Sequence, residues 1–201
     1  MIKKTLLLLL LLFCIKISNA QQINYTFPKP PQWGSEKFNF PIDFAPKIPF
    51  KGVEELRFAP GWSNNKTGEY WAYAFVWFIE GKPILNKDIL NSYMIQYYNG
   101  LYISNLKNKT ITPPSNFTTS DIKSIPPLQS DQETYEGKIM TLDFLTGEPI
   151  TFNARIHVRN LPQIGHSAIL IEISPEAYKA PVWVDMNNLV NGFAVNANNE
   201  N

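Results

Sequence analysis

The clearest pattern along the chain is an alternation of large apolar residues with polar or small ones, which is typical of β-strands. In residues 70–79 large side chains, mostly aromatic, occupy one face and alanine or valine the other. This pattern predicts a central strand that is covered on both faces. A weaker alternation predicts a short strand over 54–59. Three more strands are expected at 138–144, 150–158 and 167–173, where they form a meander.

The first hairpin of the meander is predicted to turn at residues 146–148, with the glycine at a position of positive φ. A three-residue loop pairs Leu142 with Phe152 and Asp143 with Thr151, which keeps apolar residues opposite apolar ones. In this register Asp143 lies on the polar face of the meander. The predicted apolar face of the first strand consists of Met140, Leu142 and Phe144.

Helical spacing appears between residues 89 and 101, where apolar residues recur every three or four positions. Asn86 is the expected N-cap of this main helix, and Gly100 suits its termination. A short closing helix is predicted over 181–191. Paired prolines in residues 112–130 predict an irregular surface loop.

Residues 21–53 combine many prolines with aromatic residues, which predicts an extended arm that lies over the domain and buries its rings. We therefore predict a single α+β domain over 54–192, with about five antiparallel strands and helices, including the main helix, on one face. A layered sheet of the PsbP-like kind and a half-open barrel plugged by the helix both satisfy this order. Residues 193–201 are rich in asparagine and predicted to form a disordered tail.

The start of the chain predicts export. Residues 1–20 have a charged start, an apolar run over 6–15 and small residues before Ala20, as in a secretory signal peptide cut after Ala20. The apolar run is shorter than the roughly 20 residues of a membrane-spanning helix. Lipidation at Cys14 is the weaker alternative, because a bulky residue precedes that cysteine. We expect a secreted or periplasmic protein with no transmembrane segment in its mature chain.

Composition narrows the chemistry of the mature chain. Cys14 is the only cysteine and leaves with the leader, which excludes disulfides and thiolate chemistry from the mature protein. Cleavage of the leader also removes three lysines. The mature chain then has 15 of the 18 basic residues and 17 acidic ones, so its net charge is −2. This balance does not indicate a nucleic-acid partner.

Chemically useful side chains gather on the polar face of the predicted meander. Arg155, His157 and Arg159 alternate along one strand, and we expect Asp143 and Glu172 to join them from the neighbouring strands. This group can bind an anion, or Asp143 and His157 can act as acid and base. The simpler interpretation is a solvated sheet face in which Arg155 pairs across strands with Glu172.

No catalytic or cofactor motif supports the enzymatic interpretation. The chain lacks a nucleophile elbow, a zinc-binding His-Glu-X-X-His helix, a phosphate-binding glycine loop and a dinucleotide fingerprint. A metal site requires His157 and His166 to converge with a carboxylate. We expect no cofactor and no metal, and the balance favours a protein that is not an enzyme.

The aromatic residues suggest a different kind of site. Trp33, Trp62, Trp71 and Tyr97 either fill the core or form stacking platforms for a carbohydrate. Trp62 is the best candidate for an exposed ligand-binding ring, because it follows the turn residues Pro60-Gly61.

These observations favour an exported bacterial protein of the cell envelope that binds a small molecule, a glycan or an envelope protein without catalysis. The first alternative is a hydrolase or other enzyme that uses Asp143, His157 and Arg155. The second is a structural or assembly role, in which exposed aromatic surface contacts a partner.

Overall fold

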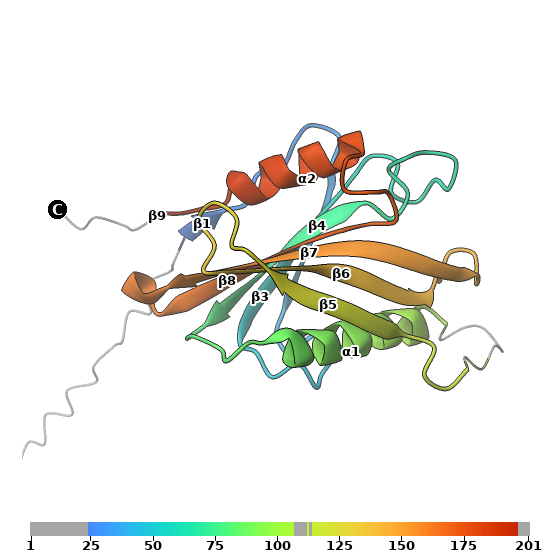
Figure 1. The fold of residues 1–201 in the computed structure, drawn as a ribbon, viewed down its shortest axis with the longest axis horizontal. Coiled ribbons are helices and arrows are strands. Elements are labelled where there is room, and N and C mark those ends of the chain that lie inside the picture. The colour runs from blue at the N-terminus through green and yellow to red at the C-terminus, as the bar shows by residue number, and fades with distance from the viewer. Residues whose placement is uncertain (1–23, 107–111, 113, 197–201) are drawn as a thin grey trace, which may run out of the picture.

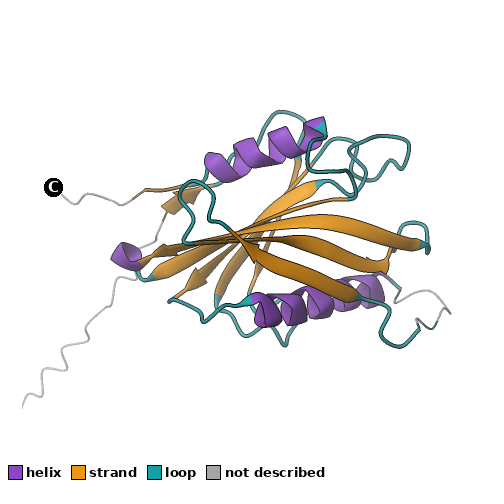
Figure 2. Cartoon of the chain, in the orientation of Figure 1, coloured by secondary structure: helices purple, strands orange, loops and turns teal. Residues whose placement is uncertain are grey.

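The computed structural model describes residues 24–106, 112 and 114–196. The predicted leader lies outside the described residues and stays a prediction. A seven-stranded antiparallel sheet forms the centre of the molecule (Figures 1 and 2). Its strands, in spatial order, are β2 (Gly34–Asn39), β3 (Gly52–Phe58), β4 (Tyr73–Glu80), β8 (His166–Ser174), β7 (Pro149–Leu161), β6 (Glu133–Leu142) and β5 (Thr119–Ile125).

Two α-helices lie on opposite sides of the sheet. Figure 1 shows α1 (Lys87–Asn105) below it and α2 (Pro181–Asn191) above it. A 3-10 turn, η1 (Pro162–Ile164), precedes β8. The architecture is mixed α/β with seven strands and helices on both faces, so the predictions of about five strands and of helices on one face were wrong. The sheet ends in two edges, β2 and β5, and is therefore open and not a barrel.

Strand β4 separates two hydrophobic clusters. Its large residues, such as Phe75 and Trp77, belong to the cluster on the α1 side. Its small residues Ala74 and Val76 belong to the cluster on the α2 side, where Trp183 of α2 is fully buried. The predicted division of this strand into a large and a small face is confirmed, as is its burial on both faces.

Helix α1 begins as predicted and ends later. The Asn86 side chain accepts hydrogen bonds from the backbone N–H groups of Asp88 (3.0 Å) and Ile89 (2.9 Å), which caps the helix. The helix continues past Gly100 to Asn105, so termination at Gly100 was wrong. A Cβ added at Gly100 lies 1.7 Å from the carbonyl oxygen of Phe44. This glycine therefore lets the arm cross the helix at close range.

Several segments predicted to be irregular contain strands. Strand β2 lies within the predicted arm, and β5 lies within the predicted loop over 112–130. Strands β1 (Asn24–Thr26) and β9 (Ala194–Asn196) form a separate antiparallel pair. The chain after residue 193 is thus ordered through β9, whereas we predicted a disordered tail from residue 193. Both β2 and β5 are edge strands, and their weaker alternation explains why the sequence did not indicate them.

The first hairpin of the meander has a different register from the predicted one. Leu142 lies opposite Pro149, and Phe152 lies opposite Ile139. The turn is longer than expected: it is closed by the Asp143 N–H, which donates to the Glu148 carbonyl at 2.8 Å. The register shifts by an odd number of residues and turns the other face of β6 toward the core, which leaves Met140 52% exposed.

Other details of the meander agree with the sequence. Gly147 has a φ of 84°, the positive value predicted for the turn. The predicted apolar faces of β7 and β8 are confirmed, and both face the α1 side. Their buried members are Phe152, Ala154, Ile156, Val158, Ile169, Ile171 and Ile173. Among the helices of the described ranges, none has the length and apolarity needed to cross a membrane.

Candidate functional site

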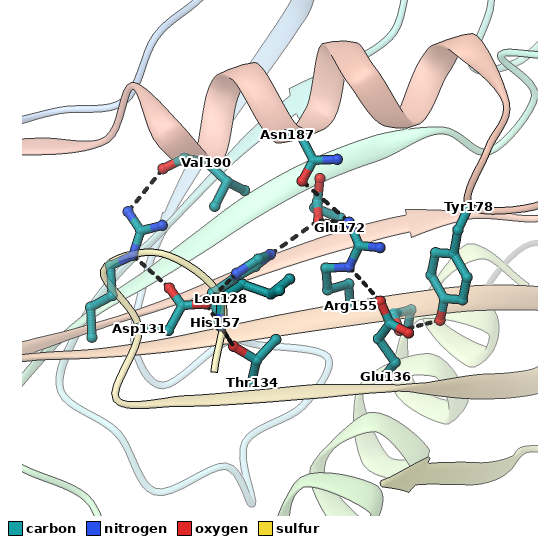
Figure 3. A network of polar contacts seen from close by, with 12 residues as sticks. Leu128, Asp131, Thr134, Glu136, Arg155, His157, Glu172, Tyr178, Asn187 and Val190 are labelled. Carbon is teal, nitrogen blue, oxygen red and sulfur yellow. Dashed lines mark hydrogen bonds and ion pairs between the residues drawn. The ribbon is translucent and has the colours of Figure 1, made fainter. Parts of the chain in front are cut away.

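The polar face of β7 is buried at His157 and Arg159, beneath α2 and the segment that carries Asp131, whereas Thr151 at the start of the strand is exposed. Glu172 has no exposed surface, His157 is 3% exposed and Arg159 is 8% exposed. Figure 3 shows Glu172 and His157 lying in the layer between the sheet and α2. The interpretation of this face as an ordinary solvated surface is therefore wrong where these three residues lie. What they can do chemically depends on the groups that they contact.

His157 lies between two carboxylates. Its Nδ1 atom is 2.7 Å from Oδ2 of Asp131, and its Nε2 atom is 3.1 Å from Oε2 of Glu172 (Figure 3). Asp131 also accepts hydrogen bonds from Arg159 Nε at 2.9 Å and from the Thr134 hydroxyl at 2.7 Å. Asp131 lies in the loop two residues before β6, and no motif in the sequence pointed to it.

Arg155 makes the cross-strand pair with Glu172 that the sequence predicted. The two residues face each other in the β7–β8 register, and Arg155 Nη1 lies 3.6 Å from Glu172 Oε2. The same guanidinium donates to Glu136 Oε1 at 2.6 Å and to Asn187 Oδ1 of α2 at 3.2 Å. It also lies over the ring of Tyr178 at 5.0 Å. This arginine links the sheet to α2.

Proton equilibria in this cluster favour charged partners. Burial lowers the pKa of His157, but the hydrogen bonds to Asp131 and Glu172 and their charges outweigh it, so the net shift is upward. Burial raises the pKa of Asp131, and His157, Arg159 and Thr134 more than reverse this, so the net shift is downward. A protonated His157 adds its positive charge to that of the arginines, and together they balance the carboxylates of the cluster. These contacts occupy both arginines and both ring nitrogens of His157, the groups that an anionic ligand or a reaction needs, and leave Glu172 Oε1 buried without a hydrogen-bond partner among the described residues.

Asp143 does not join this cluster. It lies at the β6–β7 turn, where Tyr70 donates to Oδ2, the Leu145 N–H donates to Oδ1 at 2.7 Å, and the Thr146 hydroxyl donates to Oδ2 at 2.8 Å. These contacts give it a structural role in the turn. His166 is also apart, because its Nδ1 contacts the Ile164 carbonyl at 2.7 Å. The structure thus gives Asp143 and His157 separate partners.

Three of the four aromatic candidates meet at one cavity. Trp62, Trp71 and Tyr97 line a space of about 240 Å3 between the sheet and α1, whereas Trp33 is buried in the cluster on the α2 side. The core interpretation holds for Trp71 and Tyr97, which are buried and also line the cavity, whereas the binding-site interpretation stays a prediction. The remaining lining residues are Glu36, Phe38, Phe44, Leu56, Phe58, Tyr73, Leu101, Asn105 and Phe144.

The loop between β3 and β4 fixes the two tryptophans. The Trp71 N–H donates to the Trp62 carbonyl at 2.7 Å, and the Gly61 N–H donates to Glu69 Oε2 at 2.6 Å. Trp71 has a φ of 52°, a left-handed conformation that costs a bulky residue about 1–3 kcal/mol. Ring contacts hold the side chains, since the Trp62 centroid lies 5.1 Å from that of Phe58. The cavity wall is therefore preformed.

A buried carboxylate lies next to the cavity. Glu54 Oε1 accepts a hydrogen bond from the Tyr97 hydroxyl, and Oε2 accepts one from Trp77 Nε1, both at 2.8 Å. Burial and, to a smaller extent, the charge of Glu36 raise the pKa of Glu54 to about 7 against the opposing effect of these two hydrogen bonds. Glu54 has no ion pair with a cationic side chain among the described residues.

The Trp71 indole N–H is buried without a hydrogen-bond partner among the described residues. It lies near enough to the Tyr70 hydroxyl to lower the pKa of that group, but outside hydrogen-bond geometry. Burial and the contact with Asp143 dominate and raise the pKa of Tyr70 to about 12.

A second, more polar hollow of about 300 Å3 lies beside Arg159, where Gln129, Gln132, Asn160 and Asn191 contribute amides.

Comparisons with known proteins leave the function open. No protein-family model matches the sequence, and no curated protein matches it at a significant level. One similar solved structure is that of LpqN, which is involved in cell envelope biogenesis of Mycobacterium tuberculosis. The identity is 7% over 90% of this chain and 88% of that chain, and the TM-score is 0.34.

Proposed function

We propose that this protein is an exported, non-catalytic domain of the bacterial cell envelope that binds a small molecule with an apolar body. The ligand occupies the aromatic cavity, which is the space lined by Trp62, Trp71 and Tyr97. Export to the periplasm or the exterior rests on the predicted leader over residues 1–20.

The observation that carries this proposal is the convergence of aromatic side chains from four separate segments on one preformed cavity. Phe44 comes from the arm, Phe58 from β3, Trp62 from the loop and Tyr97 from α1. Apolar pockets with a few polar groups are the usual form of small-molecule sites. A wall that is rigid before binding reduces the entropy lost on binding.

The cavity suits an apolar body better than a glycan. Beyond its rings it offers the carboxylate of Glu36 and the amide of Asn105, which are too few to satisfy the hydroxyl groups of a sugar. The buried cluster suits catalysis poorly, because Arg155, Arg159 and Glu172 are bound to neighbouring protein groups and lie under α2. An enzyme built on His157 would need α2 to move away.

A thermal-shift screen tests the proposal. Residues 21–201 are screened against neutral, cationic and anionic small organic molecules and sugars, and each hit is repeated with two variants of α1. Leu101→Trp fills the cavity, whereas Ile103→Trp adds the same ring on an exposed part of the helix, where Ile103 is 51% exposed. A hit at tenfold excess over its Kd raises the melting temperature by about 3–6 °C.

We expect this shift in the wild type and in Ile103→Trp, and its loss in Leu101→Trp. A shift that survives in Leu101→Trp contradicts the proposal. So does a diverse panel without a hit, and that result favours the structural or assembly role.

A further inference from the structure

We infer that the ligand of the aromatic cavity is a small organic cation, such as a quaternary or primary ammonium compound with an apolar body. This inference rests on the proposed binding function and adds the charge of the ligand. It comes from the combination of aromatic walls with uncompensated acidic groups around one cavity.

The walls are of the kind that attracts a cation. Trp62, Trp71, Phe58 and Tyr97 line the space, and their ring faces carry partial negative charge. A cation within about 6 Å of such a ring is stabilised, and groups of rings bind quaternary ammonium ions in this way. The rings also cover the apolar body of the ligand, so both parts of an amphiphilic cation find a partner.

The charged groups at the cavity are acidic. Glu36 of β2 contributes a carboxylate to the lining, and none of the described lining residues is basic. Glu36 makes no ion pair among the described residues, although Lys37 beside it pairs with Glu55 on the other face of the sheet. An anionic ligand meets only repulsion from these groups, whereas a cation supplies the missing charge.

Glu54 adds a second carboxylate close to the first. It is fully buried and bonded to Tyr97, and it lies on β3 two residues from Leu56, the residue opposite Glu36, so the two acids share one face of the sheet. Its direct partners, Tyr97 and Trp77, are uncharged donors. A cation bound against Tyr97 therefore supplies the opposite charge that no described side chain gives to Glu54.

Binding is then coupled to the ionisation of Glu54. The titratable groups around it are Glu36 on β2, Tyr73 on β4, and Tyr97 and Tyr98 on α1. Burial raises the pKa values of these three tyrosines, which stay neutral at physiological pH. The charge of the site near pH 7 therefore changes through Glu54. A bound cation favours the ionised form, so its affinity increases as the pH rises through about 7.

Calorimetric titration with two isosteres tests this inference. Choline carries the cation, and 3,3-dimethylbutan-1-ol has the same shape with carbon in place of nitrogen. At pH 8 we expect choline to bind at least about tenfold more tightly than the alcohol, and at pH 6 we expect choline to bind more weakly than at pH 8. The alcohol should bind equally at both pH values.

Two charge variants sharpen the test. Glu36→Gln should weaken choline about two- to fivefold without changing the alcohol. Glu80→Gln removes the same charge from the far end of β4 and should change neither. Equal binding of the two isosteres, or choline binding that ignores both pH and Glu36→Gln, overturns the cation and leaves the proposed function standing. Failure of both isosteres, together with no cavity-dependent hit in the thermal-shift screen, overturns both proposals.

Discussion

The Tyr97 hydroxyl donates a 2.8 Å hydrogen bond to Glu54 Oε1 and so joins the wall of the aromatic cavity to a buried acid. Glu54 has no exposed surface, and its pKa rises from 4.5 in an unfolded chain to about 7. A folded pKa above the unfolded value means that the native protein holds a proton that the unfolded chain releases. The free energy of unfolding therefore falls as the pH rises from about 4.5 to about 7.

Replacing this acid with its amide should remove that loss. Glu54→Gln keeps an acceptor for Trp77 and a partner for Tyr97, so we expect a protein that is roughly 3 kcal/mol more stable than the wild type at pH 8. At pH 4 the two proteins should be alike. Urea denaturation at several pH values measures this difference, and parallel pH profiles for the two proteins would count against the account.

His157, like Glu54, should make the free energy of unfolding fall as the pH rises, because both groups have a raised pKa in the folded protein. Its raised pKa means that its contribution is complete below about pH 6.5 and is lost as the pH rises through the folded pKa. Asp131 has a lowered pKa, so its contribution is lost at the acidic end, as the pH falls below about 4. We expect His157→Gln to cost roughly 3 kcal/mol at pH 5.5 and less at pH 9. Guanidinium denaturation checks this, and a cost independent of pH would contradict the protonated state.

Gly100 provides a test of how the arm crosses α1. Alanine normally stabilises a helix by about 1 kcal/mol relative to glycine. Here the added Cβ lies 1.7 Å from the Phe44 carbonyl oxygen, and backbone must shift to accommodate it. We expect Gly100→Ala to destabilise the protein by more than 1 kcal/mol. Gly68→Ala is the control, because its Cβ meets nothing within 4 Å. A stabilising Gly100→Ala would show that the arm does not lie on the helix.

The sequence predicted elements whose local pattern agrees with their final environment. Strand β4 has large residues toward α1 and small ones toward α2, and that contrast is visible in its sequence. Asn86 and the closing helix Pro181–Asn191 were predictable for the same reason, since capping and helical spacing are local. For Trp62, Trp71 and Tyr97 the sequence left two alternatives, core packing and a ligand-binding site, and it did not show that the three rings converge.

Long-range features were not predictable in this way. The register of the β6–β7 hairpin depends on how Asp143 bonds to its own turn, and an error of three residues exchanged the two faces of β6. Asp131 is the main partner of His157 and comes directly after the loop predicted over 112–130, from a segment to which the sequence assigned no element. The cover that α2 provides for the polar face depends on packing between segments far apart in the chain, which periodicity does not specify.

The most direct test of the binding site uses the indole N–H signals of the five tryptophans. Nitrogen-15-labelled residues 21–201 are titrated with choline and, in parallel, with 3,3-dimethylbutan-1-ol. Trp62 and Trp71 line the cavity, whereas Trp33 and Trp183 lie in the cluster on the opposite face of the sheet and serve as internal controls. The account predicts saturable shifts of the Trp62 and Trp71 signals with Trp33 and Trp183 unchanged. Shifts confined to Trp33 and Trp183, or no shift at all at saturating ligand, would contradict it.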